Sequence, residues 1–152
     1  MKKQMMAIGA LCVVLGAGAA NAAETVTYWD SKEKKEKTQT ACQAITASTT
    51  TLKGWYFVEG NVTITHTLQL DGTAHIILKD GARLEVCGAD SAPGIGVRYG
   101  FMVSDKLHIY GQEKGTGELV AIGGKNCPGI GGLSENSHYA HCGQVFVFGG
   151  HV

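Results

Sequence analysis

Short apolar runs separated by glycine, asparagine and aspartate make up the chain from Trp55 onward. None of them keeps the 3.6-residue spacing of apolar positions that an amphipathic helix needs. Valine, isoleucine, threonine and aromatic residues fill the runs and favour strands, while glycine between them permits tight turns. The pattern predicts strands and turns throughout this region. The expected strands are Trp55–Val58, Val62–Ile64, Leu68–Leu70, His75–Leu78, Leu84–Val86, Phe101–Val103, Leu107–Tyr110, Leu119–Val120 and Val145–Phe148.

A different pattern precedes this region. Thr25–Tyr28 alternates small polar and larger apolar residues, Asp30–Lys37 is a run of mixed charge, and Thr38–Ile45 returns to alternation. The pattern predicts a two-stranded ribbon with a charged tip; one or two turns of solvated helix are the alternative for the charged run. We assign the run no binding role, because short runs of mixed charge are usually solvated surface. We therefore expect an N-terminal ribbon or cap over residues 23–53.

Both prolines of the chain stand in the same four-residue phrase, Pro93-Gly94-Ile95-Gly96 and Pro128-Gly129-Ile130-Gly131, about 35 positions apart. At this offset Leu84 aligns with Leu119. Self-similarity at such a period is typical of stacked repeats, in which no unit buries its apolar face alone. Short strands joined by tight corners favour an all-β solenoid over a sandwich. We expect its repeats to occupy residues 54–152.

Stacked repeats place equivalent residues next to each other in successive layers. The proline phrases then form equivalent corners, where we expect positive φ angles and close backbone contacts that require glycine. The expected corner residues are Pro93, Gly94, Gly96, Pro128, Gly129 and Gly131. His75 and His108 also occupy equivalent positions, which favours a structural stack of histidines over a shared metal site. The expected inward ladders contain Ile76, Leu78, Leu84, Val86, Leu107, Ile109 and Leu119.

Several segments have a characteristic order and spacing, namely Gly54–Ile64, His75–Gly81, Leu107–Gln112 and the two proline phrases. They resemble a family of bacterial exported repeat proteins that are often described loosely as carbohydrate-binding or surface-repeat proteins. The resemblance extends from about Tyr28 to the last residue. It implies a right-handed parallel β-helix, leaves the function open and carries over no catalytic residues. Proline replaces the family's usual alanine before Gly-Ile-Gly, which stiffens the corner by fixing φ.

The first 22 residues have the pattern of an export signal. Lys2 and Lys3 precede an uncharged run from Met5 to Ala20, and Ala20-Asn21-Ala22 supplies the small-x-small site of signal peptidase. We predict a bacterial signal peptide over residues 1–22, cleaved after Ala22, and a secreted, periplasmic or cell-surface location. A membrane anchor is the alternative, but the apolar run is shorter than the roughly 20 residues that cross a bilayer.

Removal of this signal leaves about 130 residues, one domain of ordinary size. The loss of two lysines from a chain with 13 basic and 13 acidic residues gives a net charge of about −2. No basic stripe is present to contact a phosphate backbone, so we expect no nucleic-acid partner. No other apolar run is long enough to predict a transmembrane segment after signal cleavage.

Four cysteines follow the signal, namely Cys42, Cys87, Cys127 and Cys142. An even number in an exported chain favours disulfides, with three full pairings open. We favour a bond between Cys127 and Cys142, because it would restrict a short loop with little apolar surface. The alternative is a metal site with His138 and His141 of the same loop, which no Cys-x-x-Cys pair supports. We expect no metal and no cofactor.

Catalysis on polysaccharides would need paired carboxylates, or acidic calcium ligands beside a base. Arg83 and Glu85 are expected to project outward from a strand together as a solvated pair. The glycine-rich phrases lack the full phosphate-binding spacing, and Lys125 is followed by Asn126. We therefore expect no enzyme, with a polysaccharide lyase or hydrolase as the alternative. The scattered acidic residues are Asp71, Asp80, Glu85 and Asp90, and the other arginine is Arg98.

A binding role fits the sequence better. The flat faces of stacked repeats can present aromatic side chains that stack on sugar rings. Tyr99 and Tyr139, in polar loops after the proline phrases, are the expected surface aromatics, whereas Trp55 and Phe57 are expected in the core or at an end cap. We expect a non-catalytic glycan-binding or adhesive module whose partner is a glycan or another cell-surface component. A purely structural surface module is the alternative.

The residues Phe148–Val152 have the pattern of a new strand rather than of a cap. An open stack leaves unpaired backbone groups and apolar edges. The sequence therefore suggests a fragment, a truncated product, or a chain that completes itself by self-association through the open end.

Overall fold

The computed structural model describes residues 23–97, 105–132 and 143–152, and every regular element in them is a strand. These residues accordingly contain no helix of the length and apolarity needed to cross a membrane. The strands are β1 (Glu24–Asp30), β2 (Lys35–Ala44), β3 (Thr51–Val58), β4 (Asn61–Ile64), β5 (Leu68–Leu78), β6 (Arg83–Cys87), β7 (Ile95–Val97), β8 (Lys106–Tyr110), β9 (Glu118–Ile122), β10 (Ile130–Gly132) and β11 (Gln144–Val147).

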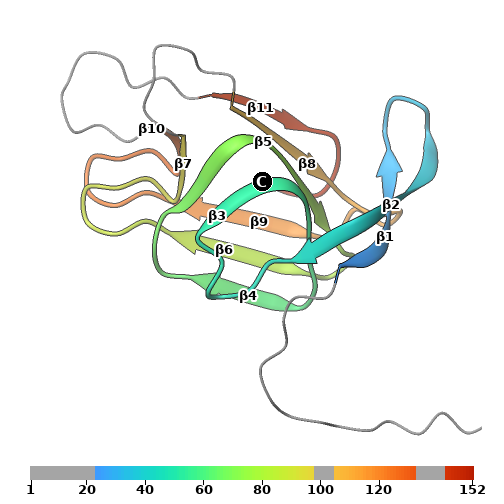
Figure 1. Cartoon of the computed structure of the whole chain (residues 1–152), viewed down its shortest axis with the longest axis horizontal. Coiled ribbons are helices and arrows are strands. Elements are labelled where there is room, and N and C mark those ends of the chain that lie inside the picture. The colour runs from blue at the N-terminus through green and yellow to red at the C-terminus, as the bar shows by residue number, and fades with distance from the viewer. Residues whose placement is uncertain (1–22, 98–104, 133–142) are drawn as a thin grey trace, which may run out of the picture.

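The strands form two sheets (Figure 1). In the larger, eight-stranded sheet β1, β2, β3, β5, β7 and β10 follow one another, and β5 also pairs with β8, which pairs with β11. The smaller sheet contains β4, β6 and β9 in that order. The β1–β2 pair is antiparallel, and the other pairs between these strands are parallel. Figure 1 shows the β1–β2 hairpin projecting from one end of the layered strands.

This arrangement contradicts the predicted right-handed parallel β-helix. A β-solenoid would close each repeat into a coil of parallel strands, whereas the two sheets do not close and the larger one is mixed, beginning with antiparallel β1 and β2. The strands are also less uniform than expected: β5 has 11 residues, and it pairs with β7 through Leu68–Leu70 and with β8 through Thr73–Ile77. The apolar pattern indicates which side chains face inward, but it does not determine how the sheets join.

The internal repeat appears as pairing between equivalent residues of neighbouring strands. Gly96 of β7 lies beside Gly131 of β10, and His75 of β5 lies beside His108 of β8. Both glycines lie within short strands, and neither has the positive φ expected of a corner, so that expectation is wrong. The prolines before these strands differ in environment, since Pro93 is buried and Pro128 is exposed.

The preceding glycines of the same phrases are required by close backbone approach. A Cβ atom on Gly94 would lie 2.8 Å from the backbone oxygen of Val86 and 2.9 Å from that of Gly129. A Cβ atom on Gly129 would fall closer than 3.0 Å to the backbone oxygen of Ala121. Real Cβ atoms do not approach oxygen so closely, so neither position has room for a side chain.

The main core lies between the sheets and is apolar, with no buried polar or charged residue within the described ranges. The residues predicted to face inward are confirmed as core, since each is at most 1% exposed. Burying a leucine or isoleucine side chain contributes about 1.5 to 3 kcal/mol, so these columns stabilise the contact between the sheets. The inward-facing residues confirmed in this way are Ile76, Leu78, Leu84, Val86, Leu107, Ile109 and Leu119.

A second, smaller cluster lies under the β1–β2 hairpin. Val26 and Cys42 of the hairpin pack against Phe57 and Ile77 of the larger sheet, and all four are buried. Adjacent residues Ile76 and Ile77 therefore belong to different clusters, one on each face of the sheet. The hairpin thus covers part of the sheet face that points away from the main core.

The charged run forms the tip of this hairpin. The Asp30 carboxylate accepts hydrogen bonds from the backbone N–H groups of Lys32 and Glu33, both at 2.9 Å, which fixes an Asx-type turn. Lys37 pairs with Asp30 at 2.6 Å across the hairpin. At the far end of β2, Gln43–Ala44 pairs with Tyr56–Phe57 of β3, so the ribbon continues the larger sheet.

Candidate binding edge

Four ring side chains line up across four strands on the outer face of the larger sheet. Trp55 of β3 pairs with His75 of β5, His75 pairs with His108 of β8, and His108 pairs with Phe146 of β11. The ring centroids are 4.1, 4.6 and 4.8 Å apart in that order. We call this row the aromatic ladder. Its members contact each other because residues that pair in register lie on the same face of a sheet.

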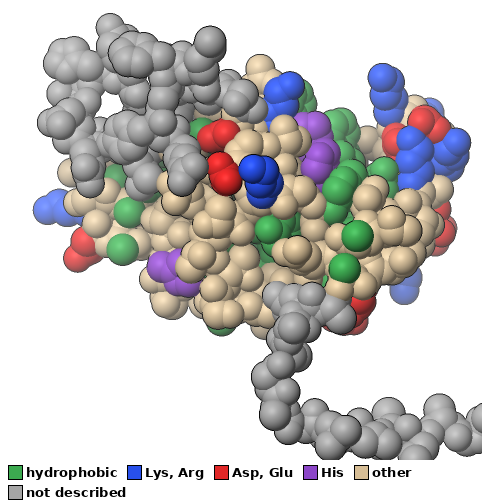
Figure 2. All heavy atoms as spheres, in the orientation of Figure 1, with side chains coloured by type: hydrophobic (Ala, Val, Ile, Leu, Met, Phe, Trp, Pro, Cys, Tyr) green, Lys and Arg blue, Asp and Glu red, His purple; other side chains and the backbone are tan. Residues whose placement is uncertain are grey.

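The hairpin covers one end of the aromatic ladder. The Tyr28 ring of β1 lies 5.5 Å from Trp55 and 4.8 Å from Tyr110, measured between centroids. The backbone N–H of Trp29 donates to the oxygen of Gly111 at 2.9 Å and holds β1 over this face. Figure 2 shows histidine and hydrophobic side chains side by side near the charged hairpin tip. The Trp55 end of the ladder is therefore closed.

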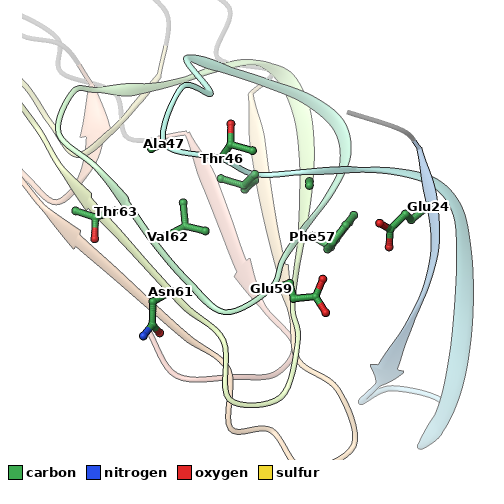
Figure 3. A pocket seen from close by; sticks show the side chains of 10 residues that line it. Glu24, Thr46, Ala47, Phe57, Glu59, Asn61, Val62 and Thr63 are labelled. Carbon is green, nitrogen blue, oxygen red and sulfur yellow. The ribbon is translucent and has the colours of Figure 1, made fainter. Parts of the chain in front are cut away.

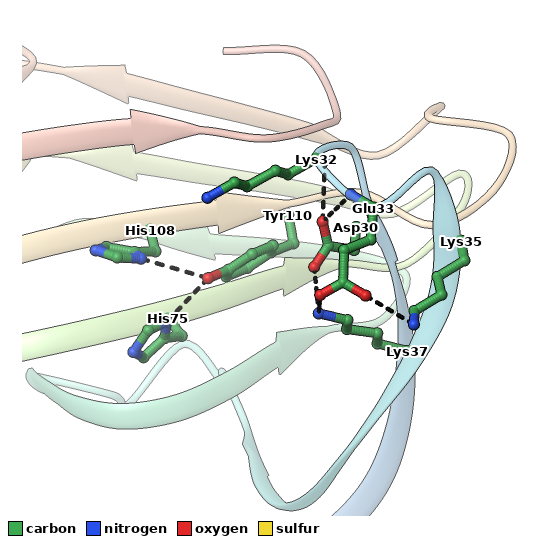
Figure 4. Close-up of polar contacts among 8 residues, drawn as sticks. All are labelled: Asp30, Lys32, Glu33, Lys35, Lys37, His75, His108 and Tyr110. Atoms are coloured by element: carbon green, nitrogen blue, oxygen red, sulfur yellow. Dashed lines mark hydrogen bonds and ion pairs between the residues drawn. The ribbon is translucent and has the colours of Figure 1, made fainter.

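Tyr110 links the two histidines of the ladder. Its hydroxyl lies 3.3 Å from Nδ1 of His75 and 3.3 Å from Nδ1 of His108, as Figure 4 shows. A hydroxyl can donate to one imidazole nitrogen and accept from another, so one tyrosine can satisfy both rings. Nε2 of His108 is buried and has no hydrogen-bond partner.

Burial determines the charge of this group. It lowers the pKa of His75 to about 4, with repulsion from His108 adding to the effect. It also lowers the pKa of His108, where Lys106 adds a smaller contribution, and it raises the pKa of Tyr110 to about 12. All three groups are therefore neutral at pH 7, and they form a neutral hydrogen-bonded stack rather than an acid–base pair.

The opposite end of the ladder is open. β11 pairs with β8 on one side, and within the described residues no strand pairs with its other side. Val145 and Val147 pair with Leu107 and Ile109, so they continue inward columns of the core. Leu107 and Ile109 are 0% exposed, whereas Val145 is 41% and Val147 51% exposed. Two core positions therefore reach solvent at the end of the layered strands.

The exposed large apolar side chains of the described residues are concentrated in the last strands and the residues that follow them. They are Ile122 of β9, Val145, Phe146 and Val147 of β11, and Val152. We call Gln144–Val147, an uncharged segment whose four residues are all exposed, the β11 edge. Figure 1 shows β11 outermost, beyond β8. Its exposed apolar residues, and an outer side that no strand of the described ranges pairs with, make it the candidate binding site.

A shallow pocket lies at the other end, beside β4 (Figure 3). It has a volume of about 440 Å³ and is lined by Glu24, Ala44, Ile45, Thr46, Ala47, Phe57, Glu59, Asn61, Val62 and Thr63. The Lys79 ammonium lies 3.3 Å from the Glu59 carboxylate and 4.5 Å from the centroid of the Phe57 ring. Lys79 therefore already lies where a cationic ligand in this pocket would contact Glu59 and Phe57.

Several predicted site residues lie outside the described residues. These are the surface aromatics Tyr99 and Tyr139, the loop histidines His138 and His141, Arg98, and Cys142. Cys42 is buried, Cys87 and Cys127 are partly buried, and no two of these three form a disulfide. The favoured bond between Cys127 and Cys142 stays a prediction. The described residues contain no group of three or more histidine, cysteine or acidic side chains placed to hold a metal ion.

The acidic residues considered for catalysis are held by separate partners. Asp71 pairs with Lys53 at 3.6 Å, and Asp80 accepts backbone hydrogen bonds from Lys114 and Thr116 at 3.2 and 3.3 Å. Arg83 bonds to Glu85 at 2.8 Å and also to Glu118. Arg83 and Glu85 are partly exposed, whereas their neighbours Leu84 and Val86 are 0% exposed, so the predicted outward pair is confirmed. Asp90 is exposed.

The expectation that Trp55 packs in the core or at an end cap is confirmed, since Trp55 is half-buried against the cluster under the β1–β2 hairpin and contacts Tyr28 and His75. The strand expected at Val145–Phe148 is present as β11. The sequence prediction did not foresee that rings from four strands line up on the outer face of the larger sheet. The sequence does contain a signal for the covered outer face. Tyr56–Val58 and Ile76–Leu78 are runs of consecutive apolar residues without alternation, and such runs indicate a strand that is covered on both faces.

Comparison of the chain with protein-family models, with curated proteins and with solved structures finds no match.

Proposed function

We propose that this protein is an exported bacterial, non-catalytic adhesive module that binds another protein chain by strand addition at the β11 edge. The observation that carries the proposal is the exposure of Val145 and Val147, at 41% and 51%, in columns whose preceding residues are 0% exposed. An added strand would pair with the side of β11 that no described strand occupies, and it would cover both valines.

The chemistry of the edge supports strand addition. Natural proteins usually protect an exposed edge strand with lysine, proline, a bulge or a covering element. The β11 edge has no charged residue and no proline, and Gly143–Gly150 as a whole carries no charge. Such an edge attracts an extended partner by main-chain hydrogen bonds and alternate apolar contacts.

The size of the edge sets the expected affinity. A net contribution of about 0.5 to 1.5 kcal/mol per hydrogen bond and about 1 kcal/mol for each half-exposed apolar side chain gives a modest total. Association costs at least about 4 kcal/mol. A short peptide should therefore bind only with a dissociation constant in the micromolar to millimolar range, and tight binding needs a partner that covers more of the open end.

A glycan is the second candidate ligand. Phe146 favours it, because the ring is 39% exposed and contacts His108 on the closed side. Sugar stacking requires a free ring face, however, and Trp55 and His75 already stack on each other at 10° between their planes. The ladder thus offers little free ring face, and strand addition is better supported. Binding to a glycan array that Phe146→Ala abolishes would favour the glycan instead.

The test uses a peptide that contains the sequence of β8, the strand that pairs with β11 in the structure. A fluorescein-labelled peptide with the sequence of Lys106–Gln112 is titrated with the purified chain, and fluorescence anisotropy measures binding. The matched control is the same peptide with alternate backbone nitrogens methylated, which removes hydrogen-bond donors and keeps the side chains. We expect saturable binding of the unmodified peptide alone. Equal binding of both peptides, or binding of neither at concentrations where the chain is monomeric, would refute strand addition.

A further inference from the structure

We infer that the strand added at the β11 edge is β11 of a second copy of this chain, so that two copies form a two-fold symmetric dimer. The inference rests on the proposed function, since it names the partner of the same edge. It follows from the difference between the two ends of the larger sheet, from the charges at those ends and from the register that two-fold symmetry allows.

At its other end the larger sheet ends in the β1–β2 hairpin, whose outer strand β1 carries Glu24 and Asp30. Gln43–Ala44 of β2 pairs with β3, the backbone N–H of Ile45 donates to the oxygen of Phe57 at 2.9 Å, and the hairpin continues beyond. β11 of a second copy therefore finds no free place beside β3. In the described residues β10 and β11 are both terminal strands at this end of the sheet, but β10 has three mostly buried residues whereas all four residues of β11 are exposed. A contact between two β11 edges closes as a dimer rather than growing as a fibre.

The charges favour the same pairing. The β11 edge is neutral, so two copies can meet without opposing like charges. At the hairpin end, Glu24 and Glu59 expose 53% and 68% of their side chains. The free edge there, β4, presents exposed Asn61 and Thr63. An apolar edge is better matched by a second apolar edge than by this polar one.

Two-fold symmetry restricts the register to pairings about one central residue, and we place that centre at Phe146, in the middle of the exposed residues. A two-fold axis perpendicular to the sheet makes the strands antiparallel and keeps inward residues inward. Phe146 then lies opposite Phe146 of the second copy, and Val145 lies opposite Val147 of the second copy. The aromatic ladder continues on the outer face, and both exposed valines become part of a shared core column.

The four-residue edge is smaller than a stable interface, which buries about 1,200 Å² or more. Ile122 and Val152, exposed by 47% and 61%, add apolar surface elsewhere on the C-terminal part of the chain. We therefore expect a dimer with a dissociation constant on the order of micromolar.

The experiment is sedimentation equilibrium of the purified full chain, as processed by the cells that express it, from about 1 to 500 µM. The disrupting variant is Val145→Lys/Val147→Lys, and the matched control is Asn61→Lys/Thr63→Lys, which adds the same charges to the free edge of β4. We expect the first variant to raise the dimer dissociation constant by about tenfold or more and the control to leave it nearly unchanged. Circular dichroism establishes whether both variants fold.

A photo-crosslinking residue at position 146 gives a second measurement that does not depend on the lysine variants. Mass spectrometry should find crosslinks between that residue and Gln144–Phe148 of a second copy. A chain that stays monomeric at 500 µM, or a dimer whose crosslinks lie elsewhere, would overturn the inference. If the chain is monomeric and still binds the unmodified Lys106–Gln112 peptide, strand addition stands and self-pairing fails. If neither is observed, the proposed function fails as well.

Discussion

Lowering the pH from 7.5 to 4.5 should destabilise the fold through His75. The ring lies between Trp55 and His108, and burial together with repulsion from His108 lowers its pKa to about 4. In the unfolded chain the pKa returns to about 6.5. Between these two values the unfolded chain binds a proton that the folded chain excludes. Stability that is fully present above pH 6.5 is therefore lost as the pH falls toward 4.

The structure sets the size of this effect. A pKa difference between about 4 and about 6.5 corresponds to about 3 kcal/mol for a fully shielded ring. Because water reaches part of the His75 ring, we expect about 1 to 2 kcal/mol. His108 adds in the same direction, since burial also lowers its pKa. The salt-bridged carboxyls Asp30 and Glu33 have lowered pKa values, so they weaken the fold mainly below pH 4.5.

Chemical denaturation at pH 7.5, 6.5, 5.5 and 4.5 measures the unfolding free energy of the wild type and of His75→Phe. Phenylalanine keeps a ring against Trp55 but does not titrate. The wild type should lose about 1 to 2 kcal/mol more than the variant across this range. His108→Phe should reduce the pH dependence by a smaller amount. Parallel pH profiles for the wild type and His75→Phe would show that His75 is not kept neutral by the fold.

Three further predictions concern other parts of the chain. Gly129→Ala should lower the melting temperature clearly, because the new Cβ would collide with the backbone oxygen of Ala121; an unchanged melting curve would refute the close approach. Asp30→Ala should lower the midpoint of a denaturant titration, because two backbone N–H groups lose their acceptor; Asp30→Asn, which keeps an acceptor, should lower it less. Peptide mapping of the non-reduced exported protein should find a bond between Cys127 and Cys142; two free thiols would exclude it.

The repeat made part of the fold predictable. His75 and His108 stand at equivalent positions, and the structure pairs them in neighbouring strands. The alternation of apolar and charged residues likewise predicted that Leu84 and Val86 face the core while Glu85 faces outward. Both predictions depend on local periodicity and on the stacking of equivalent residues in register, and both patterns are visible in the sequence.

The sheet organisation and the outer face were less predictable. Phe57 and Ile77 are buried because the β1–β2 hairpin docks on them, a contact between segments far apart in the chain. The same hairpin adds the antiparallel pair that makes the larger sheet mixed. The same docking determines the environment of Trp55, which packs against the cluster under the hairpin, since an aromatic residue suits either a core or a half-covered face. Which of the two it occupies depends on this non-local docking.

The contrast between the two ends of the aromatic ladder links fold to assembly. At Trp55 the protein covers the terminal ring with Tyr28 and a hairpin, whereas at Phe146 the described residues place nothing beyond it. Leaving Val145 and Val147 about half exposed forgoes about 1 kcal/mol each, relative to full burial. Lysine or threonine at these positions would protect the edge of an isolated monomer at little cost to its core. Apolar residues there stabilise the protein fully only when another strand covers them, and this composition is the reason why we propose β11 as a contact surface.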